Sequence, residues 1–390
     1  MNKKLIAVAV AGVLAAPAVA LAQSSVRITG NIKQSIQNME FPNAAAGRIN
    51  KSQWRLTDDA SRWTIRVNED LGRGLSAVAI FEQRFAPNTN DNTLSGGETF
   101  VGLRHTRLGS LTFGRHEMHY GKNQEKTSSL GGLLQAGHTG MFDYINGTGV
   151  GTSRELGSVR YIMPEWRGIS MLLAWGSGNP ATGNSADMTC FTAACTTAPP
   201  QGIQRRKGSF WSIDPEYNNG PIKVGYSYYI NHPDLSTTGT AGTYTAASVD
   251  MRSDVLYGAY KMGGWSFGLG WNHSKMYNST TRALQQDRTT VTPSVNYVTG
   301  PHAFAVGYTK ASKSKNAAGD IANTGADLKS ASYIYSFSKR TTAALTWAYL
   351  TNKAASNYQL YTSTSYSGKD TAPFAGENQR TYALTVNHKF

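Results

Sequence analysis

Apolar and polar residues alternate along most of the chain after Gln23. The alternation is clearest in three runs, at 169–176, 222–230 and 265–272. In the last run an aromatic residue or leucine fills every second position, with serine, glycine or asparagine between. A period of two predicts β-strands with one apolar and one polar face. Each run approaches the ~10 residues that a tilted strand needs to cross a bilayer.

The connections between the predicted strands alternate between short and long. Seven are short turns: 70–74, 107–109, 165–168, 218–220, 263–264, 299–301 and 338–340. Eight are long polar loops: 40–51, 86–97, 116–153, 177–206, 232–249, 276–286, 313–325 and 353–378. A soluble sandwich does not require every second loop to be long. The pattern therefore predicts an all-β fold, a 16-stranded antiparallel transmembrane β-barrel with short turns at one end.

Composition and closure agree with a barrel. The chain contains 40 Gly and 20 Tyr and only 16% charged residues, which suits many strands, tight turns and aromatic girdles. Hydrocarbon cannot satisfy an open sheet edge, so the first strand, about 25–38, is expected to pair with the last, 379–390.

Residues 1–22 have the form of a signal peptide. A basic start with Lys3 and Lys4 is followed by an apolar stretch and by Ala20-Leu21-Ala22, an A-x-A cleavage signal. The barrel is then expected to comprise residues 23–390. No later apolar run approaches the ~18 residues of a spanning helix, which argues against a helical membrane protein.

The chain is basic, with a formal net charge of +14, or +12 without Lys3 and Lys4. An excess of positive charge favours binding to nucleic acid, to anionic membrane surfaces or to anionic solutes. Export and the absence of a Lys/Arg run longer than 205–207 argue against nucleic acid.

The alternation stops between residues 116 and 153, although strand patterns flank this stretch on both sides. An insert of this length is usually functional or disordered. We expect it to fold into the bore of the barrel and narrow it, with the glycines of 147–151 allowing it to bend.

Four regions resemble the general trimeric porins of Gram-negative outer membranes, in the branch found in betaproteobacteria and Neisseria. They are Ser61-Arg-Trp63 with residues 69–77, residues 100–103 with 108–115, residues 154–168, and the terminal Phe390 on an alternating strand. The resemblance covers the whole mature chain. It implies a homotrimer in contact with outer-membrane lipid and lipopolysaccharide, and identifies Phe390 as the signal read by the outer-membrane assembly machinery.

The resemblance also implies a constriction in which wall arginines face carboxylates of the inserted third loop. Arg62 and Arg154 match the family's wall arginines, and Glu125 and Asp143 are candidate loop carboxylates. A third wall arginine of the family is missing, because Ser95-Gly-Gly-Glu98 stands in its place and brings in Glu98. Further basic strand positions are candidates for lining the bore, subject to which face of the strand they occupy: Arg66, Arg84, Arg104 and Arg160.

These residues predict an outer-membrane porin, a water-filled channel for passive diffusion of small hydrophilic solutes and ions, with weak anion preference. The missing arginine leaves open a substrate-selective channel on the same barrel. An outer-membrane enzyme or adhesin is a third reading, supported only by histidines in the insert and by the long outer loops.

Little in the sequence indicates other chemistry. His116-Glu-Met-His119 lacks the H-E-x-x-H spacing, no catalytic Ser/His/Asp order is evident, and neither enzyme activity, a cofactor nor a metal site is expected. Cys190 and Cys195 lie close together in the sequence, and export exposes the chain to an oxidising environment. We therefore expect one local disulfide between them; two free thiols are the alternative.

Overall fold

The structure is a computed structural model. It describes residues 24–88, 96–123, 125–128, 137–142, 144–145, 148–149, 154–177, 209–232, 249–278, 281–360 and 373–390. The predicted signal peptide, Asp143, Cys190 and Cys195 lie outside the described residues. No helix among the described residues is long and apolar enough to span a membrane.

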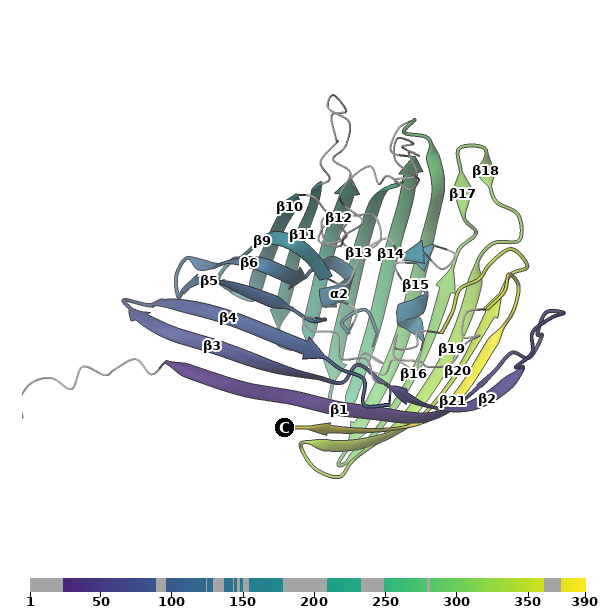
Figure 1. The fold of residues 1–390 in the computed structure, drawn as a ribbon, viewed down its shortest axis with the longest axis horizontal. Coiled ribbons are helices and arrows are strands. Elements are labelled where there is room, and N and C mark those ends of the chain that lie inside the picture. The colour runs from purple at the N-terminus through teal and green to yellow at the C-terminus, as the bar shows by residue number, and fades with distance from the viewer. Residues whose placement is uncertain are drawn as a thin grey trace, which may run out of the picture.

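Sixteen antiparallel strands form a closed ring (Figure 1). They are β1 (Ser25–Glu40), β3 (Arg62–Gly72), β4 (Leu75–Arg84), β5 (Thr99–His105), β6 (Gly109–Glu117), β9 (Arg154–Ile162), β10 (Ile169–Ser177), β11 (Ser209–Asn219), β12 (Ile222–His232), β13 (Val249–Met262), β14 (Trp265–Asn278), β15 (Leu284–Thr299), β16 (His302–Ala311), β19 (Ala326–Ser336), β20 (Thr341–Asn352) and β21 (Gln379–Lys389). Each pairs with its neighbour in chain order. The predicted fold class is confirmed.

The first and last strands close the ring. β1 pairs with β3 along its first half and with β21 from Asn31↔Lys389 to Glu40↔Arg380. Phe390 continues this pairing, since its backbone N–H and carbonyl each form a 3.0 Å hydrogen bond with Gly30. The C-terminus accordingly lies beside β1 in Figure 1. Among the sixteen described strands of the ring, closure therefore leaves no edge strand exposed to hydrocarbon.

Turn and loop lengths alternate as predicted, with one correction. β14 and β15 extend further than their polarity suggested, so the loop expected at 276–286 spans only 279–283. Two outer connections carry additional strands. β2 (Ser52–Asp58) pairs with the second half of β1, and β17 (Lys315–Asn316) pairs with β18 (Gly319–Asp320).

Side-chain burial is inverted relative to a soluble protein. On β14, Trp265, Phe267 and Leu269 are 43%, 40% and 52% exposed, whereas Asn272 and Ser274 are fully buried. Large exposed apolar residues recur on the outer face of most strands. The outer face therefore suits lipid and the inner face suits water, as period-two alternation predicts.

The insert between β6 and β9 contains short elements of secondary structure that the sequence pattern did not indicate. It contains α2 (His119–Asn123), the 3-10 turn η2 (His138–Gly140), and the short hairpin of β7 (Tyr144–Ile145) and β8 (Thr148–Gly149). It begins one residue after β6, at Met118, because β6 extends to Glu117. α2 lies inside the ring of strands (Figure 1) and contacts β11 and β12.

Apolar side chains of the insert pack against several parts of the barrel wall. Tyr120 and Phe142 contact Val255 and Tyr257 of β13, and Met118 joins a cluster with residues of β10, β11 and β12. This burial removes apolar surface from water inside the bore. Met141 packs in a further cluster with Met39 of β1, Leu328 of β19 and Leu350 of β20, so the insert contacts the wall both at β10–β13 and at these strands.

Candidate functional site

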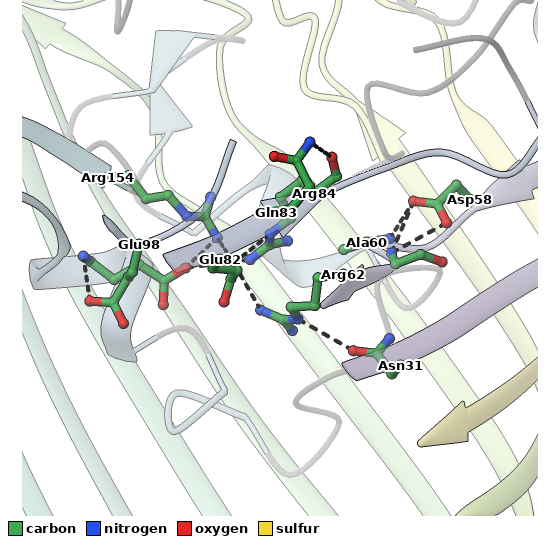
Figure 2. Close-up of polar contacts among 11 residues, drawn as sticks. Asn31, Asp58, Ala60, Arg62, Glu82, Gln83, Arg84, Glu98 and Arg154 are labelled. Carbon is green, nitrogen blue, oxygen red and sulfur yellow. Dashed lines mark hydrogen bonds and ion pairs between the residues drawn. The ribbon is translucent and has the colours of Figure 1, made fainter. Parts of the chain in front are cut away.

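Arg62, Glu82 and Arg84 form the first part of a charged cluster on the inner wall. Arg62 of β3 lies directly opposite Arg84 of β4, and Glu82 points to the same side because it is two residues from Arg84. Glu82 Oε1 accepts a hydrogen bond from Arg84 Nε at 2.8 Å and lies 3.8 Å from Arg62 Nη1. Figure 2 shows both guanidinium groups converging on this carboxylate.

Glu117 and Arg154 extend the cluster to β6 and β9, where they pair directly across the strands. The Arg154 guanidinium forms an ion pair with Glu117, and its Nη2 lies 3.9 Å from Glu82 Oε1. Arg84 Nη2 lies 3.6 Å from Glu117 Oε1. Three arginines and two carboxylates thus share contacts across four strands.

Glu98 and Arg160 complete the cluster. Arg160 Nη1 of β9 lies 2.7 Å from Glu98 Oε1, and the same oxygen accepts the Glu117 backbone N–H at 3.0 Å. The Arg160 guanidinium also lies over the Phe100 ring, 4.7 Å from its centroid. Glu98 therefore neutralises a wall arginine.

We call this group the arginine cluster: Arg62, Arg84, Arg154, Arg160, Glu82, Glu98 and Glu117. Four guanidinium groups against three carboxylates leave one positive charge in excess. The side chains are not sealed from solvent, since those of Arg62 and Arg84 are 32% and 23% exposed. Fixed, partly exposed guanidinium groups in a bore can attract and coordinate passing anions.

Polar contacts also hold the insert against the opposite wall. Lys126 Nζ lies 2.5 Å from Glu216 Oε2 of β11, and the same carboxylate accepts a hydrogen bond from the Tyr257 hydroxyl. The His119 ring shares a 2.7 Å hydrogen bond with Ser227, which itself donates to Asp214. These contacts and the apolar packing hold the insert inside the bore.

The structure brings five of the predicted site residues together: Arg62, Arg84, Arg154, Arg160 and Glu98. Arg66 shares the inner face with Arg62 but lies four residues closer to the short-turn end, opposite Ile80 and Arg27. Glu125 is exposed on the insert and makes no ion pair with the arginines among the described residues. The functional roles of all these residues stay predictions.

Sequence reasoning missed Glu82 and Glu117, the two carboxylates that contact several arginines. Strand parity could have identified Glu82, because a bore-facing Arg84 places residue 82 on the same face. Glu117 was assigned to the insert, whereas it is the last residue of β6. The carboxylates that contact the arginines were expected on the inserted loop. Instead, Glu82 and Glu117 lie on wall strands, and Glu98 lies just before β5.

The insert histidines have local partners. The His116 ring bridges Ser158 Oγ at 2.7 Å and Thr112 Oγ1 at 2.8 Å, and it stacks on Phe100. His116 lies on β6 and His119 contacts β12, so the two rings are held by different parts of the wall.

A closed antiparallel barrel, apolar outside, charged inside and narrowed by an inserted loop, belongs to the class of outer-membrane channel proteins. The comparisons agree. The family model for Gram-negative porins matches residues 7–355, and the chain belongs to that family. The family is one of outer-membrane proteins, and the family and the fold indicate a channel rather than an enzyme.

The individual relatives and solved structures share low sequence identity with this chain. An outer membrane porin protein of Bordetella pertussis is 26% identical over 197 residues, which cover 49% of this chain and 46% of that relative. The anion-selective porin from Comamonas acidovorans shares the fold with a TM-score of 0.70 at 18% identity, covering 94% of this chain and all of that one. The trimer form of OmpT from Vibrio cholerae gives a TM-score of 0.64 at 13% identity, covering 94% and 99% of the two chains.

Proposed function

We propose that this protein forms a water-filled channel for passive diffusion of small hydrophilic solutes and ions, with weak preference for anions. The observation that carries the proposal is the arginine cluster inside a closed barrel, with one guanidinium more than carboxylates. Family membership supports the channel, and an anion-selective porin from Comamonas acidovorans has the same fold.

The proposed mechanism is electrostatic. An anion approaching β3, β4 and β9 meets partly exposed guanidinium groups, whose charge is unaffected by physiological pH. The carboxylates Glu82, Glu98 and Glu117 offset most of that charge, so the attraction is expected to be modest. Screening by salt weakens it further, because the Debye length is about 8 Å at physiological ionic strength.

The experiment that tests the channel is conductance in a planar lipid bilayer. The purified protein is expected to add discrete current steps of uniform size, and liposomes containing it are expected to swell in isotonic sugar. Protein that is folded, as judged by its β-sheet circular dichroism, yet gives neither current steps nor swelling would contradict the proposal.

A substrate-selective channel is a second candidate, supported by Glu98 in place of a family arginine. Its test is block of the ion current. Block by one solute class at low concentration would favour it, whereas equal insensitivity to sugars, amino acids and carboxylates would leave the general channel.

We also propose a homotrimer, which is supported by family resemblance and by the trimer form in which the OmpT structure was solved. Mass photometry of the purified protein in a neutral detergent checks this assembly. Three chains per particle are expected, and a stable monomer would contradict it.

Recognition of Phe390 by the assembly machinery is likewise proposed, and its test is export of a chain with Phe390→Ala.

A further inference from the structure

Three arginines line the bore near the short-turn end of the barrel, apart from the arginine cluster. We call them the mouth arginines: Arg27 of β1, Arg66 of β3 and Arg104 of β5. Their neighbours in sequence include exposed apolar residues of the outer face: Val26, Ile28, Val67 and Leu103. Successive strand residues point to opposite faces, so the three arginine side chains project into the bore.

The mouth arginines lie close to one another. Arg27 and Arg66 are directly opposite on β1 and β3, which places their Cα atoms about 5 Å apart. Arg104 Nη2 donates a 2.6 Å hydrogen bond to Asn68 Oδ1. Asn68 follows Arg66 by two residues on the same face of β3. The Arg104 guanidinium group is therefore drawn across β4 toward Arg66.

Arg27 and Arg66 repeat the geometry of the arginine cluster, in which two opposed arginines share Glu82. Opposed like charges destabilise a sheet, and Glu82 relieves this for Arg62 and Arg84 by contacting both. No carboxylate in the described part of the chain forms an ion pair with a mouth arginine. All three mouth arginines are exposed. Their counter-ion therefore has to come from the solution in the bore.

The carboxylates of the adjoining turn offset only part of this charge. Asp70 has the strand parity of Arg66, and its Oδ1 accepts the Gly72 backbone N–H at 2.6 Å. Glu69 shares the outer face with Val67. Three guanidinium groups against the one carboxylate of Asp70 leave an excess of two positive charges, twice that of the arginine cluster.

We infer that the mouth arginines bind doubly charged oxyanions, such as sulfate or a dicarboxylate, an inference that rests on the proposed channel function. The guanidinium group is always charged and donates paired hydrogen bonds to oxyanions. Two negative charges match the excess of two positive charges. Two oxygens of one anion reach Arg27 and Arg66 together, as the carboxylate of Glu82 does in the arginine cluster.

This anion site is separate from the arginine cluster along the path of a solute. Arg66 follows Arg62 by four residues, about 13 Å along β3. Successive sites of moderate strength let an ion enter a channel and still leave it. Outer-membrane barrels have short turns at the periplasmic end. The mouth arginines are therefore the second site that an anion meets on its way to the periplasm.

The test is block of the chloride current through single channels in a planar bilayer at neutral pH. Sulfate and succinate are the two probes, each added at constant KCl, and nitrate is the singly charged comparison. The wild type is compared with a mouth variant that carries Arg27→Gln, Arg66→Gln and Arg104→Gln. The dianion concentration that halves the current is expected to rise about twofold for each substitution and about tenfold for all three.

A matched control variant carries Arg107→Gln, Lys339→Gln and Arg340→Gln, the same loss of charge in exposed short turns. It is expected to keep the block of the wild type, and nitrate is expected to leave the current of every variant nearly unchanged. Weaker block of the mouth variant by sulfate alone would restrict the ligand to tetrahedral oxyanions, and by succinate alone to dicarboxylates.

Weaker dianion block in the mouth variant, with the control variant unaffected, would support the inference. Equal half-blocking concentrations in the wild type and the mouth variant, or an equal loss in the control variant, would overturn it and leave the channel standing. Loss of block in Arg84→Gln with the mouth variant unaffected would assign the site to the arginine cluster and would also overturn it. A wild type without current steps would contradict the channel and this site together.

Discussion

Arg62 and Arg84 lie directly opposite each other on β3 and β4, and both guanidinium groups contact one carboxylate, that of Glu82. Opposed like charges repel, so Glu82 is the group that allows two arginines to stay close on the inner wall. Arg154 lies near the same oxygen, at 3.9 Å. Among the described residues, carboxylates of β4 and β6 hold these three arginines in place.

Glu82→Gln tests this arrangement. Removing the shared charge raises the positive excess of the arginine cluster, so anion preference is expected to increase, measured as the zero-current potential under a KCl gradient. The unfolding free energy is expected to fall by about 1–3 kcal/mol, because three guanidinium groups lose a partner. Glu125→Gln serves as the comparison and is expected to change the potential less, since Glu125 is exposed on the insert. A larger effect of Glu125→Gln would place the dominant acid on the loop.

Lys126→Gln is expected to loosen the insert. Lys126 contacts Glu216, and its loss leaves the insert held by His119 and by apolar packing. Single-channel recordings are expected to show a noisier current with more brief closures. Lys313→Gln, the same change at an exposed outer-loop lysine, is expected to leave the current unchanged. Identical traces for both variants would show that the Lys126 contact does not fix the insert.

The outer loops at the closing seam give a pH prediction. Burial alone would raise the pKa of Glu377, but hydrogen bonds from Arg48 and from the backbone N–H groups of Ala45 and Phe374 lower it below its ordinary value. A lowered folded-state pKa stabilises the protein above the unfolded value, about 4.3, and this contribution is lost as pH falls through the folded value.

Glu377→Gln is accordingly expected to reduce the unfolding free energy by about 2 kcal/mol at pH 7, and by much less at about pH 3. Urea unfolding at both pH values measures the difference. Glu40→Gln, at the more exposed Arg380 pair, is expected to cost less. A deficit for Glu377→Gln that is equal at both pH values would contradict the role of the ionised carboxylate.

Gly30→Ala tests closure of the barrel. A methyl group at residue 30 would lie 2.5 Å from Phe390 Cζ and 2.6 Å from the Arg62 carbonyl oxygen. The resulting strain is expected to destabilise the barrel by about 1–3 kcal/mol and to lower the temperature at which it unfolds during gel electrophoresis in detergent.

The matched control for Gly30→Ala is Gly258→Ala, since the nearest atom to its added methyl group is 3.9 Å away. This variant is expected to unfold at the wild-type temperature. Equal unfolding temperatures for Gly30→Ala and the wild type would show that Phe390 does not close tightly on Gly30.

The sequence predicted the barrel well because one local rule, alternation of period two, governs both faces of every strand. Strand number, closure by 379–390 and the alternation of turns and loops followed from it. The length of the loop between β14 and β15 was overestimated, because the bore-facing residues of these strands are polar and resemble loop residues.

The charged site was predictable only in part. Arg62, Arg84 and Arg154 occupy inner-wall positions, and parity relates residues within one strand. The register between the strands is shifted by irregularities at Asp70/Gly72 and at Gly114/His116, so the Arg62–Arg84 and Glu117–Arg154 oppositions could not be read from strand parity. Contacts such as Lys126 with Glu216 join residues 90 positions apart and depend on how the insert folds.

The measurement that tests the account most directly is the zero-current potential of the protein in a planar bilayer under a KCl gradient, for the wild type and for Arg62→Ala, Arg84→Ala and Arg154→Ala combined. Arg340→Ala, an exposed arginine in a short turn, is the control. Weak anion preference is expected in the wild type and the control, and loss or reversal of that preference in the triple variant. A wild-type pore that prefers cations, or a potential unmoved by the three substitutions, would contradict the placement of the arginine cluster at the constriction.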